Sequence, residues 1–204
     1  MKSQNRKSTL ILLKLNKSSK YMFISNLISL LIFIQIIDKI SSVVNRITLK
    51  LISEGTHEII NSNFIKKPLV FEGDKQIEMT NNKININSKE EFITLVWNEA
   101  LTNCSNIFMG LSNISQIDFT NFDSSSVIKM DYMFANCINL ISINFKNFNT
   151  SRVTTIQRMF LNCQKITSLD LTNFDTSNIQ DMAYMFLNCR SLTNLILSEF
   201  KNNN

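Results

Sequence analysis

A repeat of 26 residues fills the second half of this 204-residue chain and limits what the chain can fold into. Eight apolar columns stay in phase with this period between Phe122 and Phe200. Self-similarity at a period between about 20 and 50 residues is the signature of stacked repeat units. A degraded copy extends the array upstream, so we predict four units, over residues 101–121, 122–147, 148–173 and 174–200.

Each unit combines two hydrophobic rhythms. In Val127–Cys137 the apolar residues stand at i, i+3, i+6, i+7 and i+10, which places them on one face of a helix. In Leu140-x-x-Ile143-x-Phe145 the last two apolar residues flank a polar one, as in a strand with one buried face. We therefore predict an α/β solenoid in which each unit contributes a short helix and a short parallel strand.

The segment FDTSNIQDMAYMFLNCRSLTNLIL (174–197) resembles the 26-residue surface-protein repeat of the BspA-like leucine-rich-repeat family, which occurs in bacteria, mycoplasmas and protists. The resemblance covers roughly residues 101–200, and the Met-Phe-x-x-Cys core is a specific signal. It implies a leucine-rich-repeat-like solenoid, a cell-surface setting and a binding role without catalysis. It supplies no ligand and no functional residue, because the repeated residues are packing positions.

The net charge of +5 comes from the N-terminus. Residues 1–20 hold six of the 21 basic residues and no acidic residue, which leaves 15 basic against 16 acidic residues in the remainder. A nucleic-acid-binding protein carries its basic excess on the folded domain, so we expect no nucleic-acid partner. Basic residues directly before an apolar segment are instead a membrane-topology signal.

The apolar segment spans residues 21–40 and contains a run without formal charge over residues 21–37. This run is at the lower limit for a membrane-spanning helix, which needs about 20 residues. An uncleaved signal anchor is the favoured interpretation, ahead of a cleaved signal peptide and a buried soluble helix. We expect a single-pass membrane protein with its repeats on the extracellular or lumenal side, or a secreted protein if the segment is cleaved. N-x-[ST] sequons would then expose three asparagines to glycosylation: Asn103, Asn113 and Asn149.

Residues 41–100 show no repeat and predict a small β-rich cap. Residues 44–51 and 92–97 have strand character, and residues 68–79 predict a hairpin around Gly73. Such a cap would cover the first unit, because an open solenoid end exposes apolar side chains and strand edges. Only a short polar tail follows the last strand, so the C-terminal repeat is the candidate for self-association.

No motif predicts catalysis, a cofactor or a metal site. Cys137, Cys163 and Cys189 recur at the repeat period and would stack as buried thiols, with a disulfide or a metal site as minor alternatives. His57 is the only histidine, and it lies in a non-repeating segment without a recognisable catalytic partner. We therefore expect a protein that is not an enzyme.

The exposed strand face is the candidate ligand-binding surface, since the open face of a solenoid often binds partners. It carries none of the aromatic or Arg anchors that dominate binding hot spots, so a merely solvated face is an equal interpretation. The predicted function is non-catalytic binding of a protein or glycan, as in adhesion, and the alternative is a self-associating structural component. The candidate residues are Asp118, Ser142, Asn144, Lys146, Ser168, Asp170, Thr172 and Asn194.

Overall fold

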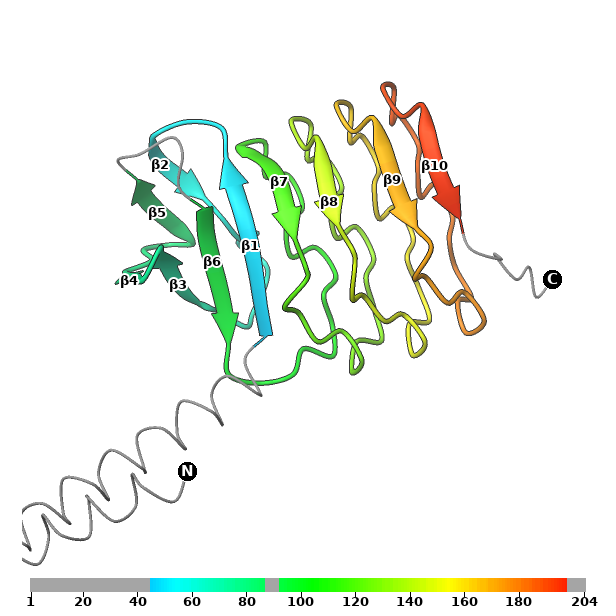
Figure 1. The fold of residues 1–204 in the computed structure, drawn as a ribbon, viewed down its shortest axis with the longest axis horizontal. Helices are drawn as coiled ribbons and strands as arrows, with labels where there is room; N and C mark the ends of the chain where they lie inside the picture. Colours follow the sequence, from blue (N-terminus) through cyan, green and yellow to red (C-terminus); the bar gives the residue numbers. More distant parts are fainter. Residues whose placement is uncertain (1–44, 87–91, 198–204) are drawn as a thin grey trace, which may run out of the picture. The chain divides into compact units, whose positions relative to one another are not determined.

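The computed structural model describes residues 45–86 and 92–197, which carry ten strands and no helix (Figure 1). Within these ranges there is consequently no helix with the length and apolar character that a membrane span requires. The predicted basic segment, the apolar segment of residues 21–40 and the polar tail lie outside the described residues.

The strands predicted before the repeats are present. The predicted hairpin is an antiparallel pair with Gly73 in its turn at φ 57°, where the left-handed backbone suits glycine. A separate two-stranded sheet pairs residues that flank this hairpin in the sequence. The strands are β1 (Asn45–Leu51), β2 (Gly55–Glu58), β3 (Leu69–Glu72), β4 (Lys75–Ile77), β5 (Lys83–Ile86) and β6 (Phe92–Trp97).

One mixed sheet continues from these strands into the first two repeat units, in the order β4-β3-β6-β1-β7-β8. β1 runs antiparallel to β7 (Ile114–Asp118), with Leu49 opposite Ile117. The strand edge of the first unit is therefore occupied by β1. An occupied edge offers no free backbone groups to another chain.

Each repeat unit contributes the strand that its alternating half predicts. These strands are β7, β8 (Ser142–Asn144), β9 (Ser168–Leu171) and β10 (Asn194–Leu197), and they lie side by side in chain order (Figure 1). β7 pairs in parallel with β8, and β9 with β10, so that residues 26 apart stand opposite each other. The 26-residue period therefore sets the register of these strand pairs.

The predicted short helix of each unit is wrong. Its place is taken by successive turns over residues 105–110, 131–136, 157–162 and 183–188. The apolar residues assigned to the helix are nevertheless buried, as Val127, Met130 and Phe134 show with no exposed surface. The hydrophobic pattern thus predicted the inward side correctly and the backbone conformation incorrectly.

Two features of the backbone explain why a helix does not form. The second and sixth residues of each turn segment have positive φ, as at Tyr132 (55°) and Asn136 (62°), which an α-helix does not allow. The N–H of Tyr132 donates to Gln157 O of the next unit at 2.9 Å, and not to a carbonyl four residues earlier. A helix this short is marginal by itself, so hydrogen bonds between units prevail.

Stacked phenylalanines run through the core of the repeat units. The rings of Phe108, Phe134, Phe160 and Phe186 follow one another at centroid distances of 5.9, 5.4 and 5.7 Å, with interplanar angles of 12° or less. A second column packs against this one at steep ring angles, and a third column packs against the second in the same way. Aromatic pairs of this kind add about 0.5–1.5 kcal/mol each beyond their buried area. The second and third columns are Phe119/Phe145 and Phe122/Phe148/Phe174.

Candidate functional site

The residues of the predicted ligand face lie together along β7–β10. Asp118 is half-buried, and the other seven side chains of this set are exposed. Two of them donate hydrogen bonds to side chains of the preceding unit: Asn144 Nδ2 to Thr120 Oγ1 at 2.9 Å, and Asn194 Nδ2 to Ser168 Oγ at 3.1 Å. Some of the polar side chains of this face therefore already have hydrogen-bond partners within the face.

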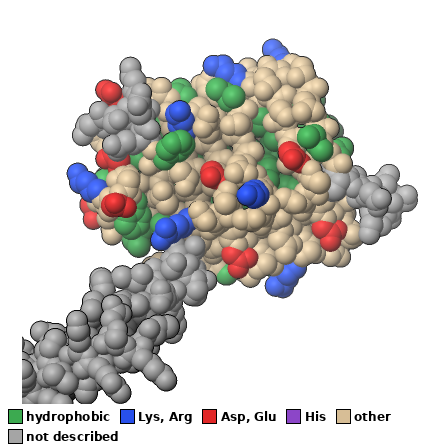
Figure 2. Space-filling model, in the orientation of Figure 1, with side chains coloured by type: hydrophobic (Ala, Val, Ile, Leu, Met, Phe, Trp, Pro, Cys, Tyr) green, Lys and Arg blue, Asp and Glu red, His purple; other side chains and the backbone are tan. Residues whose placement is uncertain are grey.

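The strand face has no charge distribution that distinguishes it from the surrounding surface. The hydroxyl and the backbone N–H of Thr172 donate to Asp170 and lower the pKa of its carboxyl below the ordinary value. On the face shown in Figure 2, acidic and basic side chains are interspersed and apolar side chains appear in separate spots. No one-sided charge or broad apolar patch gathers there.

The three sequon asparagines differ in accessibility. Asn103 and Asn149 are exposed, and their Oδ1 atoms accept hydrogen bonds from the N–H of Ser105 and Ser151 at 2.8 and 2.9 Å. The Nδ2 atom of Asn113 is buried and has no hydrogen-bond partner among the described residues. Glycosylation joins the sugar to Nδ2, so we expect Asn113 to be a poor acceptor in the folded chain.

An aromatic and arginine column that sequence reasoning missed stands on the turn segments. Arg158 lies between two tyrosines from the neighbouring units, with its guanidinium 5.4 Å from the ring centroid of Tyr132 and 4.8 Å from that of Tyr184. Arg158 Nη1 also donates to Tyr132 Oη at 2.7 Å. Tyr184 is 58% exposed. We call Tyr132, Arg158 and Tyr184 the turn-face column.

The backbone makes the turn-face column unusual. All three residues have positive φ, between 55° and 58°, which is uncommon for side chains of this size. The second left-handed position of each turn segment holds Gly110, Asn136, Asn162 and Asn188, the residue types that tolerate this conformation. Bulky residues held in such a conformation cost about 1–3 kcal/mol each and cluster at functional sites.

A polar network borders the turn-face column and fixes it. Gln157 Nε2 donates to Asp181 Oδ2 at 2.7 Å, and Gln157 Oε1 accepts a hydrogen bond from Arg158 Nη1 at 2.7 Å. Asp131 accepts hydrogen bonds from the Thr155 hydroxyl and from the Gln157 N–H. The guanidinium is therefore held in place by ring stacking and by hydrogen bonds from two units. The 26-residue period places Asn106, Tyr132, Arg158 and Tyr184 in one column of the sequence. Because the segment was predicted to be a helix, these residues were expected to lie on its solvent-facing side and were not singled out.

A comparison with protein-family models identifies the family of the repeat region. The family model described as "Mycoplasma protein of unknown function, DUF285" matches residues 97–204, which is more than half of the chain. The chain belongs to this family. DUF285 is a surface-protein repeat family related to the BspA-like leucine-rich repeats, in agreement with the resemblance seen in residues 174–197. No curated protein and no solved structure matches the chain significantly.

The cysteines of the DUF285 region are free thiols, as the repeat pattern predicted. Cys137 Sγ donates to Phe108 O at 3.0 Å, and Cys163 and Cys189 repeat this contact to Phe134 O and Phe160 O. Burial raises the pKa of the Cys104 and Cys137 thiols to about 12 and also raises that of Cys163. These thiols therefore act as packing groups with a weak hydrogen bond between units.

The DUF285 thiols give the first testable prediction. At pH 8 a maleimide should label half-buried Cys189 first, and the other three only after unfolding.

Unfolded thiols ionise near pH 8.5, whereas the buried thiols keep their protons until about pH 12, so above about pH 9 the unfolded state binds fewer protons. Stability should then fall by about 1.4 kcal/mol per pH unit for each buried thiol. Cys137→Ala should reduce this slope in urea titrations, and an unchanged slope would contradict the assignment.

His57 and the acidic residues do not form a metal-binding group in the described part of the chain. His57 lies in β2, and its ring Nε2 is 2.7 Å from the carbonyl oxygen of Ser53 in the loop before this strand. No cluster of three or more His, Cys, Asp or Glu side chains occurs in residues 45–86 and 92–197.

Proposed function

We propose that this chain is a non-catalytic surface-binding module whose contact surface is the turn-face column. The observation that carries the proposal is the Tyr132–Arg158–Tyr184 stack, in which Tyr184 is exposed, Tyr132 and Arg158 are half-buried, and Arg158 contacts both rings. Tyr and Arg are enriched among binding hot spots, and a pre-ordered side chain loses little conformational freedom on binding. The ligand class is a protein or a glycan, both of which aromatic and guanidinium groups contact well.

The proposed architecture is a solenoid of the leucine-rich-repeat type, in which turns take the place of helices. Support comes from the repeated backbone hydrogen bonds between units and from the parallel pairs β7–β8 and β9–β10. The proposed setting is a single-pass protein anchored by residues 21–37, with the repeats outside the cytoplasm, or a secreted form. The basic N-terminal segment and the family relationship support this setting.

Binding assays with two matched sets of variants test the proposed function. A panel of immobilised extracellular proteins and glycans should include at least one ligand that the protein binds saturably. Tyr184→Ala and Arg158→Ala should weaken that binding about 30-fold each, as expected for hot spots of about 2 kcal/mol. Lys146→Ala and Asp170→Asn, on the strand face, should leave it unchanged. The opposite pattern would move the contact surface to the strand face.

A second candidate function is self-association as a structural surface component. The last unit favours it, because side chains that are buried in the inner units become accessible there: Phe160 has no exposed surface, whereas its equivalent Phe186 is only partly buried. Absence of saturable binding to any panel member, together with reversible self-association, would support this candidate over the first.

A further inference from the structure

In and just before the turn segments, one set of backbone hydrogen bonds runs from N–H groups of each unit to carbonyls of the next unit. In the second unit, the carbonyls of Lys129, Asp131, Met133 and Ala135 accept hydrogen bonds from four N–H groups of the first unit at 2.8–3.1 Å. The third and fourth units repeat this pattern. The first unit follows no other unit, so its four equivalent carbonyls need donors from elsewhere. They belong to Asn103, Ser105, Ile107 and Met109.

Asn61 replaces a preceding unit at two of these four positions. Its backbone N–H donates to Ile107 O at 2.9 Å, and its Nδ2 donates to Met109 O at 2.8 Å. Within residues 45–86 and 92–197, no donor reaches the carbonyl oxygen of Asn103 or of Ser105. At the same two positions of the later units, every carbonyl accepts a backbone N–H.

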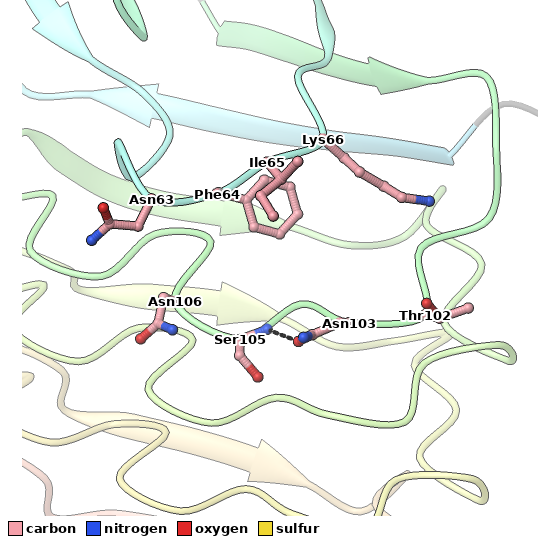
Figure 3. A pocket seen from close by; sticks show the side chains of 8 residues that line it. All are labelled: Asn63, Phe64, Ile65, Lys66, Thr102, Asn103, Ser105 and Asn106. Carbon is pink, nitrogen blue, oxygen red and sulfur yellow. Dashed lines mark hydrogen bonds between the residues drawn. The ribbon is translucent and has the colours of Figure 1, made fainter.

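A cavity of about 290 Å³ lies where these two donors are missing. Residues 63–66 form one wall, and Thr102, Asn103, Ser105 and Asn106 form the other. The two segments face each other across an open space in Figure 3. Ile65 is 89% exposed at this site, and Lys66 Nζ is paired with Glu99 Oε2 at 3.1 Å. The cavity thus offers an apolar contact and no unpaired charge.

We propose that this pocket binds an extended, uncharged peptide segment, which donates two backbone N–H groups two residues apart to Asn103 O and Ser105 O. N–H groups with this spacing, those of Cys104 and Asn106, fill the equivalent positions of the second unit at 2.9 Å each. The peptide takes the place of a preceding unit, as in the addition of a strand to an open edge. An apolar side chain of the peptide covers Ile65.

Selection of peptides against the full-length protein tests the pocket. A displayed library of random dodecapeptides is panned against the wild type, and the enriched peptides are synthesised for affinity measurements. Ile65→Lys should weaken their binding at least tenfold. Ile52→Lys, the same substitution at a 48% exposed residue outside the pocket, should leave it unchanged. Arg158→Ala should also leave it unchanged, because the pocket does not depend on the turn-face column.

N-methylation of the peptide tests the hydrogen bonds themselves. Methylating two amides two residues apart should weaken binding at least tenfold at each position, and methylating the amide between them should have little effect. Backbone carbonyl shifts of Asn103 and Ser105 should move on binding. The proposal is overturned if no peptide is enriched, if the enriched peptides tolerate every single N-methylation, or if they bind Ile65→Lys as well as wild type. Binding of chito-oligosaccharides in the pocket, in place of peptides, would assign it to glycans.

Discussion

Replacing Phe160 with Asp is expected to unfold the repeat units. The Phe160 ring has no exposed surface and stacks between Phe134 and Phe186 at 5.4 and 5.7 Å. Removing a buried phenylalanine costs about 3–5 kcal/mol, and burying an unpaired carboxylate adds several more. A domain of this size has about 5–15 kcal/mol of total stability, so the variant should lose its cooperative melting transition. Met185→Asp, at a 5% exposed side chain, should act in the same direction.

The matched control is Asp170→Asn on the strand face. The Asn side chain keeps an oxygen that can accept the hydrogen bond from the N–H of Thr172, so its melting temperature should stay close to that of wild type. Circular dichroism during heating compares the variants. Equal tolerance of Phe160→Asp and Asp170→Asn would show that the phenylalanine columns do not form the core.

A fragment of residues 40–204 is expected to associate with itself through the last repeat unit. In the third unit, the N–H groups of Ile156, Arg158, Phe160 and Asn162 donate to the fourth unit at 2.8–2.9 Å. The equivalent N–H groups of the fourth unit have no acceptor among the described residues; they belong to Met182, Tyr184, Phe186 and Asn188. Leu187, Ile196 and Leu197 of the same unit are each more than 40% exposed. An open edge with apolar side chains recruits another chain.

Sedimentation velocity of this fragment at tens of micromolar should show dimers or larger species. Leu187→Lys should restore the monomer, because a charge at the open end opposes docking. Ile52→Lys, a matched substitution in the loop after β1, should leave the association unchanged. A monomeric wild-type fragment would show that the polar residues after Leu197 protect the end, and would remove the main support for the structural candidate function.

The sequence by itself determined the repeat length, the inward side of each unit and most of the strands, with β2 among those it did not predict. Side chains 26 residues apart that are all apolar, such as Phe134 and Phe160, have a low free energy only when they are buried together, and stacking achieves this. Strand alternation and the turn at Gly73 act over a few residues, so local patterns predict β1, β6 and the β3–β4 hairpin.

Tertiary structure alone decided the backbone between the strands and the surface that it presents. A helix and a chain of four-residue turns bury the same side chains of Val127–Cys137, so hydrophobic spacing does not distinguish the two conformations. The choice depends on hydrogen bonds between units, such as Tyr132 N–H to Gln157 O, whose partners are 25 residues apart. The same bonds align Tyr132, Arg158 and Tyr184. In the first unit, which has no preceding unit, Asn61 donates only to the carbonyls of Ile107 and Met109, and the carbonyls of Asn103 and Ser105 stay open.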